Sequence, residues 1–281
     1  MRAFEFDVWR CAHCGLLFCN PYPSPAQLEH YYQSDMKAFE NAFFLESFEN
    51  RVRLFAPRVE ILTRIKPAGS LLDVGSAIGI FIEAVRRSGA GYALTCCDLS
   101  AEVCAGLRQR FPGIEVIQSN VLDLNDARRY DVVTLWDTIE HVVDLDGLME
   151  VLGRILADDG ILVFSTPNTA SFEWRIAGER HVQILPPGHV NLMNPTCIGI
   201  LLERHGFAVR EAHTLNASLD ITYVDKLIAD GTADITRLGT FLRDELSDPD
   251  FRAMLERYLI DKRRAGNIVV VAERAGRSAA A

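Results

Sequence analysis

The sequence lacks any apolar run long enough to cross a membrane. A spanning helix needs about 20 consecutive apolar residues, and no stretch of the 281-residue chain provides them. The first ten residues, MRAFEFDVWR, also contain no apolar segment of the length that a signal peptide requires. We therefore expect a cytoplasmic protein with no membrane partner.

An excess of positive charge is missing as well. The chain has 29 Lys and Arg residues against 38 Asp and Glu residues, which gives a formal net charge of −9. An acidic surface repels a phosphate backbone, so we expect no nucleic-acid partner. Since 49% of the residues are hydrophobic and 24% are charged, the composition is typical of a globular protein with a sizeable core.

The cysteine count does not suit a disulfide framework. Seven is an odd number, and no signal peptide points to an oxidising compartment. We therefore expect free thiols, core residues or metal ligands at these positions: Cys11, Cys14, Cys19, Cys96, Cys97, Cys104 and Cys197.

From residue 70 onward, short apolar runs alternate with amphipathic segments. The pattern predicts strands over 70–75, 92–100, 114–120, 130–137 and 160–168, with helices over 78–89, 100–111 and 144–160 between them. This spacing is typical of βαβ units, so we expect a parallel sheet covered on both faces. A helix over 194–206 and strands over 207–215 and 267–274 follow, and residues 45–66 read as helical with a break near Pro57.

The loop after the first of these strands, LLDVGSAIG, lacks the G-x-G-x-x-G pattern of dinucleotide-binding folds. Its spacing is Gly75-x-x-x-Gly79, with Ala77 in the middle position. Asp73 precedes the turn, where a carboxylate would repel a pyrophosphate but suits a cationic amino-acid ligand. Asp98 ends the next strand, where a carboxylate can accept hydrogen bonds from two ribose hydroxyls.

With these motifs, the segment from about Leu71 to Phe207 resembles the class I S-adenosylmethionine-dependent methyltransferases. The resemblance includes D-x-G-x-x-x-G, the acidic residue after the second strand, YDVVTLWDTIEHV at the fourth strand and GILVFSTPN at the fifth. It implies a Rossmann-like seven-stranded α/β fold with helices on both faces and S-adenosyl-L-methionine as cofactor. It also implies four units: an N-terminal cap over 1–44, the cofactor-binding core over 45–216, a helical insertion over 217–264, and the last core strand with a flexible tail over 265–281.

The resemblance carries the cofactor contacts over to nine positions. The loop that holds the methionine part corresponds to Asp73, Gly75, Ser76 and Gly79, and the residue near the cofactor's amino-acid end to Asp137. The ribose ligand corresponds to Asp98, and the adenine contacts to Leu99, Asn120 and Val121. The family often has an acidic residue where this chain has Asn120, whose amide oxygen can accept the same hydrogen bond. Asp123 is the alternative for this contact.

His141 and His189 are the candidate catalytic residues. His141 follows Glu140 just after the fourth strand, and His189 lies in PPGHVNLMNP, which resembles a substrate-lid segment of the family. Histidine is the usual general base near neutral pH. A structural role for either histidine, a lesser role for His181, and a divalent ion held by His141 and His189 are the alternatives; the sequence by itself assigns no metal ligand.

The N-terminal stretch RCAHCGLLFCNPYPSP contains one half of a zinc knuckle. Cys11, Cys14 and Gly15 match the downstream C-x-x-C-G of a methyltransferase subfamily, but the upstream pair of cysteines is missing, and structural zinc takes four ligands. Three interpretations stay open. The first is a relic site that has lost its metal and is held by packing. The second is a zinc site that Cys19, His30 or a partner chain completes. The third is a gene start further upstream.

These observations predict a methyltransferase that acts on a small-molecule acceptor, by O-methylation in secondary or cell-surface metabolism, with a homodimer as the candidate assembly. N- or C-methylation of a small molecule or sugar is one alternative. A non-catalytic cofactor-binding module and an NAD-dependent oxidoreductase are the alternatives from other functional classes. The lid and the insertion, rather than the sheet, should select the acceptor.

Overall fold

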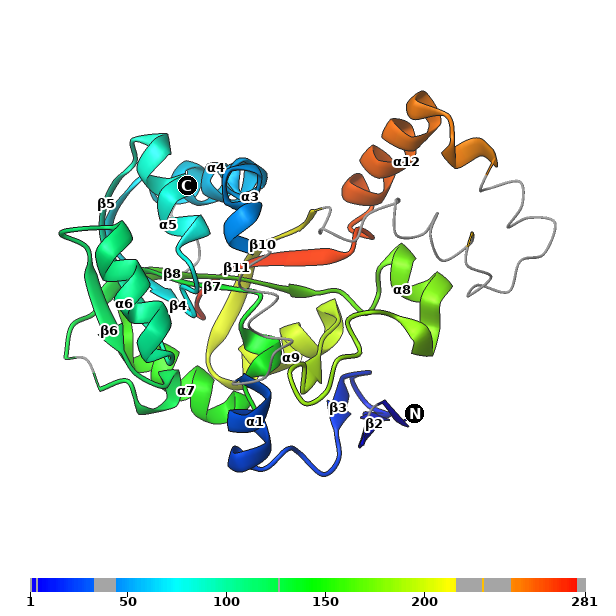
Figure 1. Cartoon of the computed structure of the whole chain (residues 1–281), viewed down its shortest axis with the longest axis horizontal. Helices are drawn as coiled ribbons and strands as arrows, with labels where there is room; N and C mark the ends of the chain where they lie inside the picture. The colour runs from blue at the N-terminus through cyan, green and yellow to red at the C-terminus, as the bar shows by residue number, and fades with distance from the viewer. Residues whose placement is uncertain are drawn as a thin grey trace.

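A seven-stranded sheet with helices on both sides dominates the computed structural model, which describes residues 2–3, 5–32, 44–125, 127–215, 229 and 244–276 (Figure 1). Its strands are β4 (Ala68–Val74), β5 (Gly91–Asp98), β6 (Glu115–Gln118), β7 (Tyr130–Trp136), β8 (Leu156–Pro167), β10 (Phe207–Leu215) and β11 (Asn267–Arg274). The helices are α1 (Pro25–Tyr32), α3 (Phe48–Leu54), α4 (Ala56–Ile65), α5 (Ile80–Ser88), α6 (Ala101–Arg110), α7 (Leu145–Ile155), α8 (Phe172–Ala177), α9 (Pro195–Arg204) and α12 (Pro249–Asp261).

The strand order is β10-β11-β8-β7-β4-β5-β6. The five strands from β8 to β6 are parallel to one another, while β11 is antiparallel to both β8 and β10. The chain order reverses at β4, whose neighbours are β5 and β7, so the carboxyl ends of these strands lie beside a topological switch point. The predicted seven-stranded α/β architecture is confirmed.

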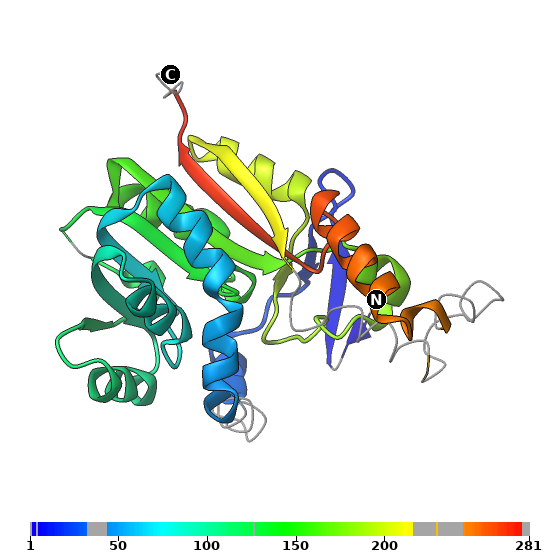
Figure 2. The ribbon, with the colours of Figure 1, turned by 90° about the horizontal axis from the view of Figure 1, so that it is seen from above.

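Alternating side chains of each strand enter two cores. Leu72 of β4 belongs to the core under α7 and α9, whereas its neighbour Leu71 belongs to the core under α3, α4, α5 and α6. Strand β7 repeats the alternation with Val133 and Val132. The view from above shows α3 and α4 running across one face of the sheet, with α9 on the other face (Figure 2). Polar residues such as Asp98 and Asp137 stand at the carboxyl ends of the parallel strands, outside both cores.

The helix expected over 144–160 ends earlier than predicted. Helix α7 stops at Ile155, and β8 begins at Leu156, which pairs with Tyr130. The apolar residues Leu152, Ile155 and Leu156 suit a helix face and a strand start equally, so periodicity could not separate the two. The break expected near Pro57 is confirmed, although it falls at Phe55 and Pro57 lies in the first turn of α4.

Residues 1–35 contain strands that the sequence pattern did not reveal. β2 (Phe6–Arg10) and β3 (Leu17–Cys19) form a hairpin, β1 (Arg2–Ala3) pairs with β2, and β9 (Asn191–Leu192) of the predicted lid pairs with β3. The strands were missed because they are short and because β3 completes its pairing with a segment about 170 residues away. The lid and the N-terminal cap thus share one sheet.

Among the described residues, no helix is both long and apolar enough to span a membrane. Most of the expected insertion over 217–264 lies outside the described residues, apart from residues 229 and 244–264, which include α12. The last five residues of the expected flexible tail are outside them too. The four domain boundaries stay predictions.

Candidate functional site

The loop between β4 and α5 has two positions that require glycine. Gly75 has φ +73°, and a Cβ there would lie 2.6 Å from Thr138 Oγ1. Gly79 has φ +82°, and a Cβ there would collide with the ring of Phe111. The Gly75 amide also donates to the Cys97 carbonyl at 2.8 Å, which joins the loop to β5. The loop is therefore held close to the strand ends on both sides.

Asp98 connects this loop to the end of β5. Its Oδ2 accepts a hydrogen bond from the Ala77 amide at 3.0 Å, and its Oδ1 accepts one from the Ser100 amide at 3.0 Å. Both bonds fix the carboxylate at the carboxyl end of the strand. An oriented carboxylate at this place can accept further hydrogen bonds from two vicinal hydroxyls.

Asp73 lies beneath the loop. Its side chain is 2% exposed, and Oδ1 accepts a hydrogen bond from Thr134 Oγ1 at 2.7 Å. Burial raises the pKa of Asp73 to about 7. Ser76 is also buried and donates to the Asp73 carbonyl oxygen at 2.8 Å. Both residues stabilise the turn, and their direct contact with a methionine group stays a prediction.

The residues expected around adenine follow β5 and β6. Leu99 is 58% exposed immediately after Asp98, while Val121 packs against the core at the start of a 3₁₀ turn. Asn120 caps that turn, since its Oδ1 accepts a hydrogen bond from the Leu122 amide at 3.0 Å. An amide oxygen has two lone pairs, so the predicted contact of Asn120 with an adenine amino group is still open to it.

Asp137 follows β7 in a left-handed conformation, with φ +49°. Its amide donates to the Ser165 carbonyl, and its Oδ1 accepts hydrogen bonds from Ser165 Oγ at 3.0 Å and Asn267 Nδ2 at 2.6 Å. Three strands thus hold one exposed carboxylate in a conformation that is unfavourable for aspartate. Such conformations concentrate at functional sites.

Arg58 of α4 is a site residue that the sequence analysis missed. It is only 7% exposed, its guanidinium lies 4.5 Å from the ring centroid of Phe55 and 5.9 Å from that of Trp136, and its Nε has no hydrogen-bond partner. Burial lowers its pKa, while the nearby charge of Asp137 opposes that shift. The signal was available, because Arg58 lies three residues after Phe55 and four before Leu62, on the apolar stripe of the helix.

Beside this end of the sheet, Glu140, His141 and His189 come together. One ligand atom from each lies within 4.8 Å of the others, and the two imidazole centroids are 4.8 Å apart in an edge-to-face arrangement. Glu140 is 1% exposed and accepts a hydrogen bond from Thr166 Oγ1 at 3.1 Å. Burial raises its pKa well above the usual value, and the charge of Asp137 adds to the shift. The two predicted catalytic histidines are therefore neighbours in space, although they lie 48 positions apart in the sequence.

Hydrogen bonds to carbonyls define the tautomer of both histidines. His141 Nδ1 lies 2.9 Å from the Gly188 oxygen, and His189 Nδ1 lies 2.9 Å from the Gln183 oxygen. Because a carbonyl only accepts, each Nδ1 carries the proton in the neutral ring, and Nε2 is the basic nitrogen. Together with the Glu140 carboxylate, the two imidazoles offer a set of ligand atoms that can take a proton or hold a divalent cation.

The cysteines of the half-knuckle do not assemble a metal site in the described part of the chain. Cys11 and Cys14 lie in the turn of the β2–β3 hairpin, where the Cys11 amide donates to the Leu16 carbonyl at 2.8 Å. The only cluster of three metal-binding side chains among the described residues is Glu140, His141 and His189. Cys19 is buried in the hairpin and, like His30, does not complete a site with Cys11 and Cys14.

Comparison with known proteins places this geometry in a family. Residues 46–212 match the methyltransferase domain family. The chain is 34% identical over 127 residues to a ubiquinone biosynthesis O-methyltransferase of Salmonella paratyphi A, covering 42% of this chain and 52% of that protein. It is 31% identical over 202 residues to a probable S-adenosylmethionine-dependent methyltransferase of Mycobacterium tuberculosis, covering 68% and 60%. The chain thus spans 52% and 60% of the length of these two relatives, less than two thirds of either.

A solved structure confirms the fold. The structure of DhpI in complex with SAH superposes with a TM-score of 0.51 at 16% identity, covering 90% of this chain and 97% of that one. At this identity the likeness concerns the fold alone. The match to the family over more than half of the residues is the stronger finding, and it shows that this chain belongs to the methyltransferase domain family.

Proposed function

We propose that the protein transfers a methyl group from S-adenosyl-L-methionine to a small-molecule acceptor, most directly to a hydroxyl oxygen. One observation carries the proposal: Asp98 and Asp137 stand at the carboxyl ends of β5 and β7, the two parallel strands that flank β4, and Glu140, His141 and His189 cluster beside them. The first pair suits the two ends of the cofactor, and the cluster suits the reacting group of the acceptor. Family membership and the names of the relatives support the reaction class.

The residues present fit this cofactor. Asp98 would accept hydrogen bonds from the ribose hydroxyls, and Leu99 and Val121 would cover the adenine. The buried Arg58 would bind the cofactor's carboxylate, because its Nε lacks a partner and a buried guanidinium is stabilised by an opposite charge. Asp137 would bind the cofactor's ammonium group, with which an exposed carboxylate forms a charge-assisted hydrogen bond.

The cofactor supplies a sulfonium methyl group that is already a strong electrophile, so the protein has to align a nucleophile and remove a proton. The acceptor oxygen bonds to the methyl carbon while the carbon–sulfur bond breaks, and S-adenosylhomocysteine leaves. In our proposal, Nε2 of His189 or His141 takes the hydroxyl proton. The Gln183 and Gly188 carbonyls keep the two imidazoles in the required tautomer.

The names of the relatives suggest which atom of the acceptor is methylated. An O-methyltransferase among them favours an oxygen nucleophile, and secondary or cell-surface metabolism stays our prediction for the setting. A nitrogen or carbon nucleophile would use the same alignment. An NAD-dependent oxidoreductase is disfavoured because Asp73 and Ala77 do not suit a pyrophosphate.

The experiment is a transfer assay with methyl-labelled S-adenosylmethionine and fractions of small-molecule extract, followed by mass spectrometry of the labelled product. We expect release of S-adenosylhomocysteine and a label on oxygen. His189→Ala should reduce turnover by about 100-fold or more while the affinity for S-adenosylhomocysteine stays within about threefold of wild type. His205, whose Nε2 pairs with Asp146, offers a matched control, His205→Ala, with unchanged turnover. Normal turnover in His189→Ala would contradict the assignment, and no transfer with any fraction would favour a non-catalytic binding module.

The same cluster favours a second role for the histidines. Two imidazole nitrogens and a carboxylate within 4.8 Å of one another are ligand types that divalent cations accept, and a cation would offset the cost of ionising the buried Glu140. A bound cation would polarise the acceptor hydroxyl. Treatment with EDTA followed by addition of Mg²⁺, Mn²⁺ or Zn²⁺ separates the two roles. Loss and recovery of turnover indicate a cation site, and unchanged turnover indicates a histidine base.

A further inference from the structure

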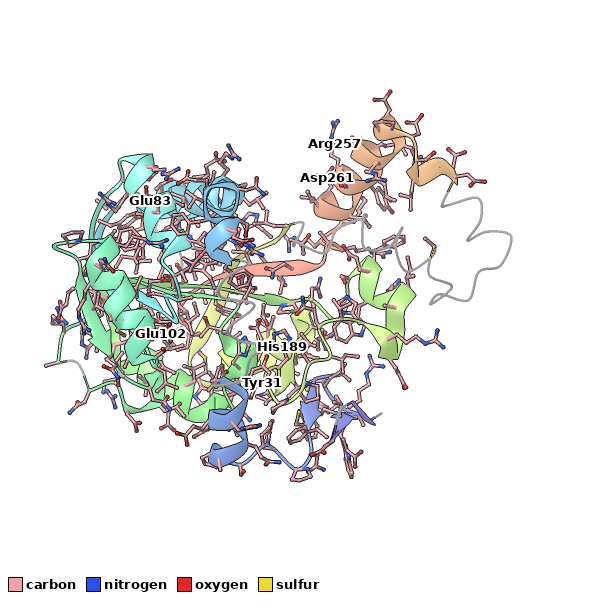
Figure 3. All side chains as sticks on the ribbon, viewed as in Figure 1. Tyr31, Glu83, Glu102, His189, Arg257 and Asp261 are labelled. Carbon is pink, nitrogen blue, oxygen red and sulfur yellow. The ribbon has the colours of Figure 1, made fainter. Side chains whose placement is uncertain are left out.

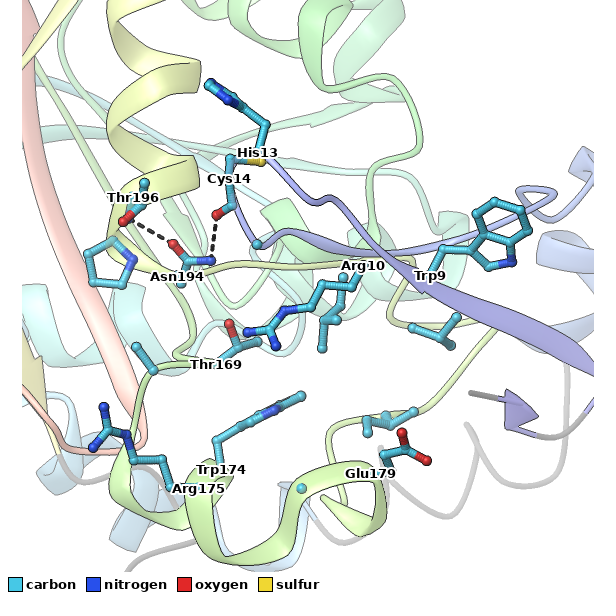
Figure 4. A pocket seen from close by; sticks show the side chains of 17 residues that line it. Trp9, Arg10, His13, Cys14, Thr169, Trp174, Arg175, Glu179, Asn194 and Thr196 are labelled. Atoms are coloured by element: carbon cyan, nitrogen blue, oxygen red, sulfur yellow. Dashed lines mark hydrogen bonds between the residues drawn. The ribbon is translucent and has the colours of Figure 1, made fainter.

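A large cavity lies between the N-terminal hairpin, α8 and the start of α9 (Figure 4). Its volume is ≈ 980 Å³, at the upper end of the range for small-molecule sites. None of the residues proposed for the cofactor or for proton transfer lines it. The cavity is therefore a separate feature of the fold, and the proposed function leaves it unexplained.

Two arginines give the wall of this cavity a local positive charge. Arg10 of β2 and Arg175 of α8 both line it, and neither has a carboxylate partner in the part of the chain that the structure describes. Several other arginines are paired with carboxylates, as Arg87 is with Glu49 at 2.7 Å. Among the described residues that line the cavity, Glu179 is the only carboxylate. On a protein with a net charge of −9, two such guanidinium groups favour an anionic ligand.

An indole stands beside these charges. The Trp174 ring stacks on His181, with centroids 4.2 Å apart and an interplanar angle of 25°, and Figure 4 shows it reaching into the cavity below Arg10. Trp9, which also lines the cavity, is 55% exposed. Aromatic side chains that border a cavity provide stacking surfaces for planar rings.

The remaining polar groups suit a ligand with hydroxyl groups. The Glu179 carboxylate accepts hydrogen bonds only, and the hydroxyls of Thr169 and Thr196 both donate and accept. A phosphate ion alone would occupy a small part of the volume and would make no use of the indoles.

We propose that this cavity binds a phosphate ester that carries a planar ring and a hydroxylated linker, the chemistry of a nucleoside diphosphate. Arg10 and Arg175 bind the phosphates, Trp174 stacks on the ring and Glu179 accepts from the hydroxyls. Ile184 of the wall follows Gln183, whose carbonyl holds His189. A ligand in the cavity therefore contacts the segment that orients the candidate base.

Isothermal titration with UDP and ADP tests the proposal. It is run on the whole protein, with and without saturating S-adenosylhomocysteine, so that binding at the cofactor site is separated from binding at the cavity. We expect at least one of the two diphosphates to bind in the presence of S-adenosylhomocysteine. Uridine, adenosine and pyrophosphate should each bind at least about tenfold more weakly. Arg10→Ala should weaken diphosphate binding by about tenfold or more, and higher salt should weaken it in the wild type.

Arg257→Ala is the matched control, because Arg257 is an exposed arginine of α12 that does not line the cavity (Figure 3). It should leave diphosphate binding unchanged. Urea unfolding of each variant reports on its folding, and Arg175→Ala is the second variant if Arg10→Ala is unstable. Three results would overturn the proposal: no binding of either diphosphate below about 1 mM, binding that survives in both cavity variants, or pyrophosphate binding as tight as that of the diphosphates. Because the readout is binding, a failure of methyl transfer would not affect the outcome.

Discussion

At the scale of single residues, Arg58 and His181 show what burial does to a basic side chain. Arg58 stays beside two aromatic rings with Asp137 as its nearby opposite charge. His181 is 7% exposed and accepts a hydrogen bond from the Gln183 amide through Nδ1 at 3.2 Å. The first residue is suited to bind an anion, and the second is held neutral.

Arg58→Met should weaken binding of the cofactor's amino-acid end and leave binding of its adenosine end unchanged. The variant loses the proposed ligand of the carboxylate, so we expect the affinity for S-adenosylhomocysteine to fall by about 10- to 100-fold. Methylthioadenosine, which lacks the amino-acid part, should bind within about threefold of its wild-type affinity. Isothermal titration measures both. An equal loss for the two ligands would show that Arg58 acts through the structure of the site and not through the carboxylate.

His181 should make stability depend on pH in the acidic range. Burial lowers its pKa from 6.5 to about 4, so between these values the unfolded chain binds a proton that the folded chain does not. This contribution to stability is complete above pH 6.5 and is lost as the pH falls toward 4. In His181→Phe, which keeps a ring against Trp174, urea midpoints at pH 7 and pH 5 should differ less than in wild type. An undiminished difference would assign the acid sensitivity to other groups.

At the scale of elements, Asn194 ties the N-terminal hairpin to the core. Its Oδ1 accepts hydrogen bonds from the Thr196 and Cys197 amides at 2.8 and 3.0 Å and so caps α9, while its Nδ2 donates to the Cys14 carbonyl at 3.0 Å. A second hydrogen bond between these parts of the chain is donated by the Tyr22 hydroxyl to Asn191 Oδ1 at 2.8 Å. The hairpin therefore depends on side chains that lie about 170 to 180 residues further along the chain.

Asn194→Ala should lower the free energy of unfolding by about 1 to 2 kcal/mol, the usual range for a lost N-cap, and should also loosen the hairpin. Ser100→Ala is the matched control, since Ser100 caps α6 through the Val103 amide at 3.3 Å without touching the hairpin. Urea unfolding measures the first effect and the rate of Cys14 modification by a thiol reagent the second. The rate should rise in Asn194→Ala only; a similar rise in both variants would argue against the tie.

At the scale of the whole molecule, the sheet brings together residues that are distant in sequence. Gly75, Asp98 and Asp137 were predictable because each follows an apolar run, and parallel strands share one carboxyl edge. The proximity of His141 and His189 was not predictable from spacing, because the pairing of β9 with β3 positions the second histidine. The hairpin strands and the cavity at α8 escaped prediction for the same reason: they are built from short segments that pair across the chain.

S-adenosylhomocysteine should raise the thermal stability of the whole fold, and NAD should not. A ligand at about 100 times its Kd adds about 2.7 kcal/mol to the free energy of unfolding. S-adenosylhomocysteine should therefore raise the thermal midpoint by several degrees, whereas NAD at the same concentration should not. A larger shift with NAD would support the oxidoreductase alternative.

The most direct measurement is a crystal structure with S-adenosylhomocysteine. We predict ribose hydroxyls on Asp98, the cofactor's carboxylate on Arg58 and the sulfur atom directed toward the cluster of Glu140, His141 and His189. A sulfur atom directed away from this cluster, or a ligand bound without contact to Asp98 and Arg58, would contradict this prediction.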